Sequence, residues 1–332
     1  GGVDGGAVAA EGTSEKNLNL DIVLKMQSYL EKLGYKKELF GELAQPGSLV
    51  GEFTDEVAAI VGYKAKVVLP ATHDTASAVL AAPLSGQTPY ISSGTWSLMG
   101  TELSSPIINK ETESYNITNE GGAYGKICFL KNIMGLWMIQ CVKKEYNDKY
   151  SFTDFVDEAR KVKDFDSLVE VNDMSFFAPD SMINAVKSYC ADYGLKIPET
   201  VGEVMNVVYR SIATSYAKTI KALEQITGVN YPVLNIVGGG SKDGYLNTLA
   251  KELTGKKVLV GPTEGTAVGN LLAQAISSTK TDPATYLLAV KYIETLNEMV
   301  SGKDNKTIHI PYEASGLLSS IGSIKDMFKG NA

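Results

Sequence analysis

The sequence predicts an α/β fold in which three strands form a meander, a helix follows, and two strand-turn-helix units complete the order. The first observation is the run "PYISSGTWSLMGTEL", which predicts two strands joined at Ser-Ser-Gly-Thr, with "GKICFLKN" as the third strand. The second is a long amphipathic pattern over residues 201–227. The third is that "YPVLNIVGGGSKDGYLNTLAKELTG" and "KKVLVGPTEGTAVGNLLAQAISS" share the order strand, glycine turn, helix.

The segment before the meander has weaker patterns. Residues 1–12 are rich in Gly and Ala and nearly uncharged, which is typical of a flexible lead-in. A helix is expected over residues 20–34, because apolar residues recur at spacings of three and four and Gly34 is a typical helix end. The run "KAKVVLPATHD" predicts a short buried strand interrupted by Pro70.

A helix is also expected in "IMGLWMIQCVKKEYN", directly after the third strand. One face of it carries apolar residues, for which core packing is the expected role. These residues are Met134, Trp137, Met138, Cys141 and Val142. Residues 151–199 are mixed and acidic, with a turn around Pro179, and we interpret them as an insertion before the two strand-turn-helix units.

The helix over residues 201–227 has the clearest local signals. Thr200 and Glu203 have the spacing of a capping box, and Gly228 supplies a C-terminal stop. Its apolar positions fall on one stripe, which predicts a face packed on the core. The stripe consists of Met205, Val208, Ile212, Tyr216, Ile220, Leu223 and Ile226.

Composition bounds the function classes. With 332 residues and 44% hydrophobic composition the chain can bury a large core in one or two domains. A net charge of −7 without a long basic run disfavours nucleic-acid binding and favours a protein that acts on small molecules. Three widely spaced cysteines suggest neither a disulfide framework nor a zinc site, which fits a reducing cytoplasm. No signal-like segment or run of about 18 apolar residues supports secretion or membrane spanning.

Two glycine-containing turns are candidate anion sites. Gly238-Gly239-Gly240 follows a buried strand and precedes a helix, where glycine lets the backbone approach a flat ring or a phosphate. It fits neither a Walker phosphate loop nor the G-x-G-x-x-G fingerprint, and a tight strand-to-helix turn is the alternative. Ser92-Ser93-Gly94-Thr95 could cradle a second phosphate, and an ordinary hairpin turn is its alternative.

The pair His73-Asp74 is the candidate acid-base group, with a metal-ligand pair or a hydrogen-bonded strand end as alternatives. Neighbouring strand residues point to opposite faces, so a hydrogen-bonded His-Asp dyad is not expected and Asp74 acts as a solitary carboxylate. The other histidine, His309, lies in an alternating run that predicts a structural role in a late strand. Common hydrolase motifs are missing. Two candidate anion-binding turns and one carboxylate are groups that suit a phosphoryl-transfer site.

Several runs together resemble the FGGY carbohydrate kinase family, and within it the branch that phosphorylates L-rhamnulose. These runs are "THDTASAV", "YISSGTWSLMG", "NITNEGGAYG", "LKNIMGLWMIQ", "NIVGGGSKDGYLN" and "GPTEGTAVGN". The resemblance covers residue 31 to the end and implies the actin/hexokinase superfamily, with two ribonuclease-H-like domains that close on ATP and sugar. Residues 88–332 would form the C-terminal domain and residues 31–87 a remnant of the N-terminal domain with the hinge. Residues 1–30 do not match.

The resemblance also implies roles for particular residues. Asp74 would accept the proton of the O1 hydroxyl of L-rhamnulose, giving L-rhamnulose 1-phosphate, while Mg²⁺ bridges the phosphates of ATP without protein ligands of its own. The other implied contacts are His73, Thr75 and Asn132 with the sugar, Thr95 with the ATP phosphates, and Gln140, Gly239 and Gly240 with the nucleotide. Thr75 departs from other branches of the family, which have Gln there. The implied partners are small molecules, with neither nucleic acid nor membrane.

One departure from the family concerns the N-terminal domain. The family's phosphate loop, a D-x-G-x-S-S-G-R-like run, does not occur in this sequence, so we expect a truncated form of the kinase. Two alternatives stay open. The chain could be a catalytically silent nucleotide-binding module, or it could belong to a kinase for a related deoxyketose such as L-fuculose.

Overall fold

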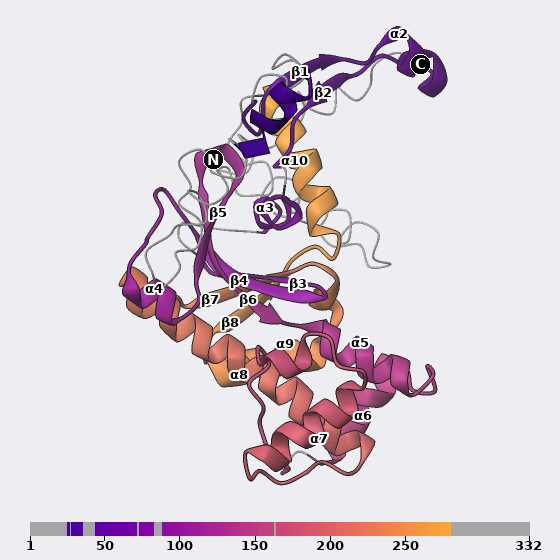
Figure 1. Cartoon of the computed structure of the whole chain (residues 1–332), viewed down its shortest axis with the longest axis vertical. Coiled ribbons are helices and arrows are strands. Elements are labelled where there is room, and N and C mark those ends of the chain that lie inside the picture. The colour runs from indigo at the N-terminus through magenta and orange to yellow at the C-terminus, as the bar shows by residue number, and fades with distance from the viewer. Residues whose placement is uncertain are drawn as a thin grey trace, which may run out of the picture.

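The structure, a computed structural model, describes residues 25–26, 28–35, 44–71, 73–82, 88–162 and 164–279. Over these residues a six-stranded sheet has the order β5-β6-β4-β3-β7-β8, with helices on both faces (Figure 1). Its strands are β3 (Tyr90–Ser93), β4 (Trp96–Leu103), β5 (Thr118–Gly121), β6 (Ile127–Met134), β7 (Val233–Val237) and β8 (Lys257–Val260). The predicted lead-in over residues 1–12 and His309 lie outside the described residues.

The sheet confirms the predicted meander. β3, β4 and β6 pair antiparallel in that order, while β7 pairs parallel to β3 and β8 pairs parallel to β7. Strands β7 and β8 come from the two predicted strand-turn-helix units, and the helix between them is the crossover that makes this pair parallel. The sequence prediction missed β5, which pairs antiparallel with the first half of β6.

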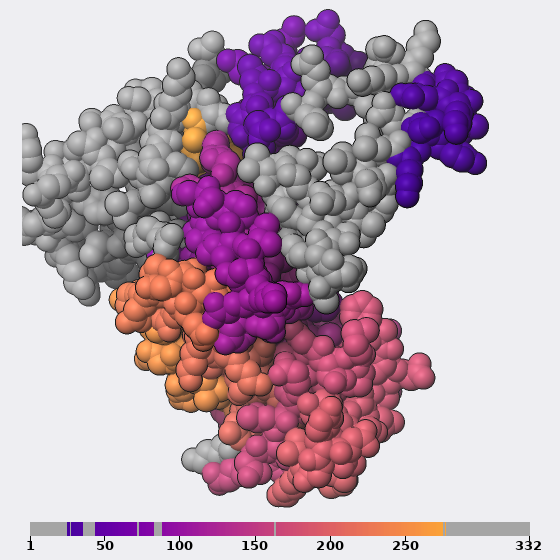
Figure 2. Space-filling model, turned by 60° about the vertical axis from the view of Figure 1, so that its left-hand side comes forward, coloured from indigo at the N-terminus to yellow at the C-terminus, as the bar shows by residue number. Residues whose placement is uncertain are grey.

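The helices of the sheet domain are α4 (Lys110–Ser114), α5 (Leu136–Glu145), α6 (Phe152–Lys161), α7 (Met182–Asp192), α8 (Val201–Thr227), α9 (Gly244–Thr254) and α10 (Gly265–Thr279), with short 3₁₀ turns η2 (Ala123–Gly125), η3 (Met174–Phe176) and η4 (Gly239–Lys242). Of these, α5, α8, α9 and α10 follow the predicted order, whereas α4, α6 and α7 were not predicted. The interpreted insertion, residues 151–199, folds into α6, η3 and α7. It forms the lobe at the bottom of Figures 1 and 2.

Helix α8 confirms its prediction at both ends. Thr200 and Glu203 form the reciprocal capping box, and Gly228 adopts a left-handed φ of 70° directly after the helix. The predicted stripe is buried from Met205 to Leu223, and Ile226 is partly buried against the same core. The Ser97 and Tyr216 hydroxyls lie 2.7 Å apart, so β4 and α8 are joined by a buried hydrogen bond as well as by apolar contact.

Helix α5 confirms the predicted core role of its apolar face with one shift. Met138, Ile139 and Val142 are buried, whereas Trp137 and Cys141 are only partly buried. Met134 is buried too, but it is the last residue of β6. The face therefore includes Ile139, which the sequence pattern did not place on it.

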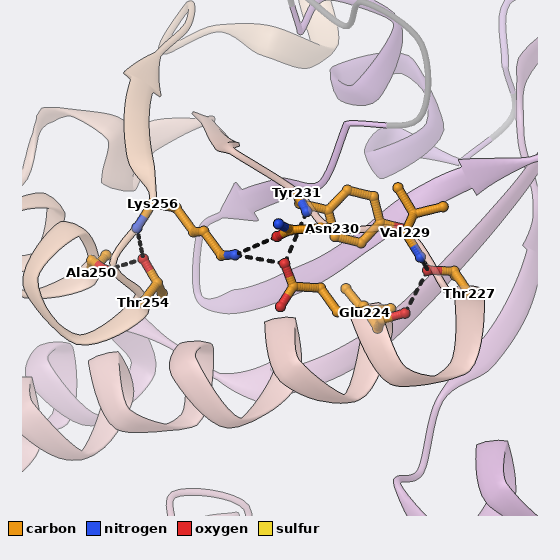
Figure 3. Close-up of polar contacts among 9 residues, drawn as sticks. Glu224, Thr227, Val229, Asn230, Tyr231, Ala250, Thr254 and Lys256 are labelled. Carbon is orange, nitrogen blue, oxygen red and sulfur yellow. Dashed lines mark hydrogen bonds and ion pairs between the residues drawn. The ribbon is translucent and has the colours of Figure 1, made fainter.

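The end of α8 is tied to the start of β8 by a partly buried ion pair (Figure 3). Lys256 Nζ lies 2.6 Å from Glu224 Oε1, with side chains only 15% and 23% exposed. The same Glu224 oxygen accepts a hydrogen bond from the Tyr231 backbone N–H at 2.9 Å. One carboxylate thus fixes the chain as it leaves α8 and enters β7.

The segment before the sheet corrects one prediction. The run around Pro70 forms β2 (Lys66–Val68), but this strand is largely exposed and, among the described residues, pairs only with β1 (Leu49–Glu52) in a separate two-stranded sheet. Helix α2 (Asp55–Val61), which lies between them, buries no residue. At the expected N-terminal helix, residues 28–32 are helical and Gly34 ends it with a φ of 85°, while its start lies outside the described residues.

Candidate functional site

A cleft of about 620 Å³ opens at the end of the sheet where β3 and β7 finish. Its walls come from the start of helix α3 (Asp74–Leu80), the β3–β4 turn, the glycine run after β7 and the loop between β8 and α10. The lining residues are His73, Asp74, Thr75, Ala78, Ser92, Ser93, Gly94, Thr95, Trp96, Leu98, Glu120, Asn132, Gly238, Gly239, Thr263, Glu264, Gly265 and Thr266. Six predicted site residues, from segments far apart in the chain, therefore line one cleft.

His73 and Asp74 do not occupy a strand, so the inference that they point to opposite faces was wrong. His73 is the N-cap of α3 and Asp74 is its first residue. The Thr75 backbone N–H is 2.6 Å from Asp74 Oδ1 and 3.2 Å from His73 Nδ1, and these two side-chain atoms are 3.4 Å apart. Since Nδ1 accepts that hydrogen bond, the neutral imidazole carries its proton on Nε2.

The β3–β4 turn is fixed from both sides. The Gly94 N–H donates to the Trp96 carbonyl at 2.8 Å, and the Gly94 and Thr95 carbonyls accept from the first N–H groups of α5 at 3.2 and 3.0 Å. These bonds satisfy donors that a helix start leaves unpaired. The Thr95 side chain is exposed on the cleft side of this fixed turn.

The glycine run contains both a tight turn and an open backbone surface. A Cβ at Gly238, which has a φ of 88°, would lie 2.8 Å from the Ser93 carbonyl, and one at Gly240 would lie 2.0 Å from Ser93 Oγ. A Cβ at Gly239 would meet no atom within 4 Å. Gly238 and Gly240 are thus required by packing, while Gly239 leaves backbone accessible to a ligand.

A second cavity of about 600 Å³ lies on the other side of Gly239. The predicted nucleotide residues Gln140, Gly239 and Gly240 all line it. So do Leu136, Ile139, Phe152, Thr153, Val156, Arg160, Lys242, Asp243, Gly244 and Tyr245. The Arg160 guanidinium sits over the Tyr245 ring at 5.1 Å, and burial raises the pKa of the Tyr245 hydroxyl. This cavity combines apolar and aromatic walls with two cations, Arg160 and Lys242, and one carboxylate, Asp243.

Asn132 reaches the cleft from β6, beyond the point where β5 ends its pairing. There the Asn172 side chain takes the place of a neighbouring strand. Its amide donates to the Asn132 carbonyl at 2.8 Å and its oxygen accepts from the Met134 N–H at 2.8 Å. Sequence reasoning missed Asn172, because it lies in the acidic insertion without a motif of its own.

Other lining residues were also missed, chiefly Glu120, Glu264, Thr266 and, in the second cavity, Arg160. No local pattern identifies them, although Glu120 lies within one quoted family run and Glu264 and Thr266 lie within another. In the part of the chain that the structure describes, no group of three or more His, Cys, Asp or Glu side chains could hold a metal ion. No helix within that part is long and apolar enough to cross a membrane.

Comparison with known proteins places these residues in a family. The model of the FGGY family of carbohydrate kinases, C-terminal domain, matches residues 89–278. The rhamnulokinase of Oceanobacillus iheyensis is 44% identical over 253 residues, covering 76% of this chain and 54% of the relative. That of Bacillus subtilis is 43% identical over 251 residues, covering 75% and 52%. The chain spans about half the length of the curated relatives it matches.

Solved structures confirm the predicted fold class. Gluconate kinase from Lactobacillus acidophilus superposes with a TM-score of 0.56 at 13% identity, over 92% of this chain and 61% of the other. Glycerol kinase from Plasmodium falciparum with ADP gives 0.52 at 11% identity, over 83% and 53%. Both share the fold of this chain over the residues they cover. On the match of more than half its residues, the chain belongs to the FGGY family of carbohydrate kinases.

Proposed function

We propose that this chain is the part of an ATP-dependent L-rhamnulose kinase that carries the proton acceptor and the nucleotide contacts. The single observation that carries the proposal is the shared cleft. Asp74 from α3, Thr95 from the β3–β4 turn and Gly239 from the β7–α9 turn line one cavity. Similarity to rhamnulokinases suggests the sugar, and the product is L-rhamnulose 1-phosphate.

Asp74 has the geometry of a held proton acceptor. Its Oδ1 accepts a hydrogen bond from the Thr75 N–H at 2.6 Å, which leaves Oδ2 as the oxygen that can accept a proton. In the proposed reaction, Oδ2 accepts the O1 proton as the O1 oxygen forms a bond to the γ-phosphorus of ATP and the bond to the ADP oxygen breaks. His73, Thr75 and Asn132 would bind sugar hydroxyls. Mg²⁺ on the phosphates would reduce their negative charge.

The second cavity supports the nucleotide assignment. Gly239 separates the two cavities, so a nucleotide seated among Gln140, Gly240 and the apolar walls could extend its phosphates past Gly239 toward Thr95. The Arg160 and Lys242 side chains give that cavity positive charge for an anionic ligand. Because the walls of this cavity include Leu136, Phe152 and Tyr245, we place the base and ribose there.

The chain acts, in our proposal, together with the other half of the kinase. From residue 25 to residue 70, no described side chain is buried, although Leu49, Val50, Ile60 and Tyr63 are large and apolar. A two-stranded sheet and a seven-residue helix are marginal on their own, so this surface needs a covering layer. This supports the expectation of a truncated form, and the boundary between residues 87 and 88 stays a prediction.

The test compares ADP release with L-rhamnulose, with L-fuculose and without sugar, alongside calorimetric ATP binding. In a form that turns over, Asp74→Asn should lower kcat by about 10²–10⁴-fold while ATP binding stays normal, since a positioned base contributes that much. Asp55→Asn is the matched control, because it is also acidic and in the first turn of a seven-residue helix. Near-normal turnover by Asp74→Asn would contradict the assignment.

One alternative function has an observation in its favour. The exposed apolar surface of residues 44–70 also fits a chain that binds nucleotide without transferring phosphate. ATP binding with no sugar-dependent ADP release would support that module. Faster turnover with L-fuculose than with L-rhamnulose would instead identify L-fuculose as the preferred substrate.

A further inference from the structure

Helices α3 and α10 pack side by side on one face of the sheet, beside the cleft (Figure 1). We call this helix–helix contact the joint. The contact is close because α10 presents glycine. A Cβ at Gly269 would lie 1.7 Å from the Ser77 carbonyl oxygen, and one at Gly265 would lie 3.3 Å from the Ala78 Cβ. The backbones of the two helices therefore touch, and a shift of α10 has to move α3.

Two side-chain hydrogen bonds cross this joint. Thr266 Oγ1 donates to the backbone carbonyl of Asp74 at 3.1 Å, and the Ser77 hydroxyl donates to Asn270 Oδ1 at 2.8 Å. Each bond joins residues more than 190 positions apart, with separations of 192 and 193. The first of them reaches the very residue that the proposed chemistry uses.

The loop before α10 also contacts the glycine run. The Gly238 N–H donates to the Pro262 carbonyl at 3.1 Å, four positions before Thr266 in the chain. One short loop is therefore hydrogen-bonded to the proposed proton acceptor at one end and to the proposed phosphate-side turn at the other. The segment that leads into α3 contributes Ala71, which is buried and accepts a hydrogen bond from the Ser77 hydroxyl at 3.1 Å, whereas no described side chain from residue 44 to residue 70 is buried.

We propose that Thr266 and Asn270 are positioning residues that fix Asp74 relative to the glycine run. Thr266 acts through the Asp74 carbonyl, and Asn270 acts through Ser77, one turn further along α3. The base role of Asp74 rests on the proposed function, whereas its fixed position does not. The hydroxyl of Thr266 is the essential group, so serine should replace it and valine should not.

The experiment reads the position of Asp74 without any substrate. The Thr75 amide proton donates to Asp74 Oδ1 at 2.6 Å, so its NMR shift and its pH profile report the carboxylate's placement, with His73 Nδ1 the other group in reach. Hydrogen exchange of the α3 amides gives a second readout. The variants are Thr266→Val, Asn270→Ala and the rescue variant Thr266→Ser. Thr248→Val is the control, since it removes a bond from Thr Oγ1 to a carbonyl within α9 alone.

We expect Thr266→Val and Asn270→Ala to move the Thr75 signal and to speed α3 exchange about tenfold. Thr266→Ser and Thr248→Val should match the parent chain. Unchanged Thr75 signals and α3 exchange in both Thr266→Val and Asn270→Ala would overturn the proposal, as would a serine variant that behaves like valine. If Thr266→Val does not fold, the exposed Asn270 site carries the test.

These outcomes are separable from those of the proposed function. If the variants show the expected NMR changes but the chain releases no ADP with any sugar, the positioning proposal is supported and the kinase assignment is contradicted. If Asp74→Asn abolishes turnover while Thr266→Val and Asn270→Ala both leave the Thr75 signal and α3 exchange unchanged, the kinase assignment is supported and the positioning proposal is overturned.

Discussion

Alanine substitution along the glycine run should separate stability from binding at neighbouring positions. In Gly240→Ala, the new Cβ would lie 2.0 Å from Ser93 Oγ, 2.8 Å from Ser93 Cβ and 3.1 Å from Leu136 Cδ1. Ser93 is buried, so it cannot move into solvent. Overpacking of this kind costs about 1–3 kcal/mol of the free energy of unfolding.

Gly239→Ala should behave in the opposite way. Its Cβ meets no atom within 4 Å and its φ is not left-handed, so the chain should be as stable as the parent or about 0.5 kcal/mol more stable. Gly239 lines both cavities, and the proposal runs the ATP phosphates past it, so the added methyl group should meet the bound phosphates. A steric penalty of about 1.4 kcal/mol there weakens ATP binding about tenfold.

The assay pairs urea unfolding, followed by circular dichroism, with calorimetric ATP titration of the same samples. Gly121→Ala is the control for both, because its Cβ also meets nothing within 4 Å and Gly121 lines neither cavity. Wild-type ATP affinity in Gly239→Ala would refute the phosphate placement. Wild-type stability in Gly240→Ala would refute the steric reasoning about the turn.

Two further predictions concern stability. Lys256→Met should cost about 1–3 kcal/mol in urea unfolding, because it leaves the partly buried Glu224 carboxylate without its cation, whereas Lys218→Met, from a pair 68% and 45% exposed, should cost under about 1 kcal/mol. The capping N–H groups of Thr200 and Glu199 lower the pKa of Glu203 from its ordinary 4.5, so its contribution is complete above that pH and is lost as the pH falls through the lower folded pKa. Unfolding of Glu203→Gln should therefore depend less on pH below 4.5; an unchanged pH dependence would contradict this.

The sequence was most informative where a structure is determined locally. Both ends of α8 were predicted, because the Thr200 and Glu203 side chains and the left-handed Gly228 act within one turn of the helix. The strand β5 was missed because its residues, TNEG, include only one β-branched side chain, Thr118, and no aromatic one, whereas Asn, Glu and Gly are depleted in strands. The burial of β2 was predicted wrongly, since burial depends on what packs over a strand and its own composition does not encode that.

The individual segments of the candidate site were predictable from the sequence, but the contacts between those segments were not. The glycine run and the β3–β4 turn carry backbone signals, and residue chemistry singled out Asp74, whereas only the family resemblance supplied Asn132 and Gln140. The helical placement of His73 and Asp74 was missed, because Pro70 and the preceding apolar run favoured a strand. Thr266 and Asn172 were missed for another reason. Their partners lie 192 and 40 positions away, and contacts across such distances leave no periodic trace in one sequence.

The charge of the cleft limits what this chain can do alone. Its lining includes the carboxyl groups of Asp74, Glu120 and Glu264, and within the described residues no Lys or Arg lines it. Phosphoryl transfer concentrates negative charge on the phosphate oxygens, and catalysis consists largely of offsetting that charge. Positive charge has to enter this cleft from elsewhere. The proposed sources are the Mg²⁺ carried by ATP, the Arg160 and Lys242 side chains of the adjoining cavity, and the polypeptide proposed to cover the exposed apolar surface of residues 44–70.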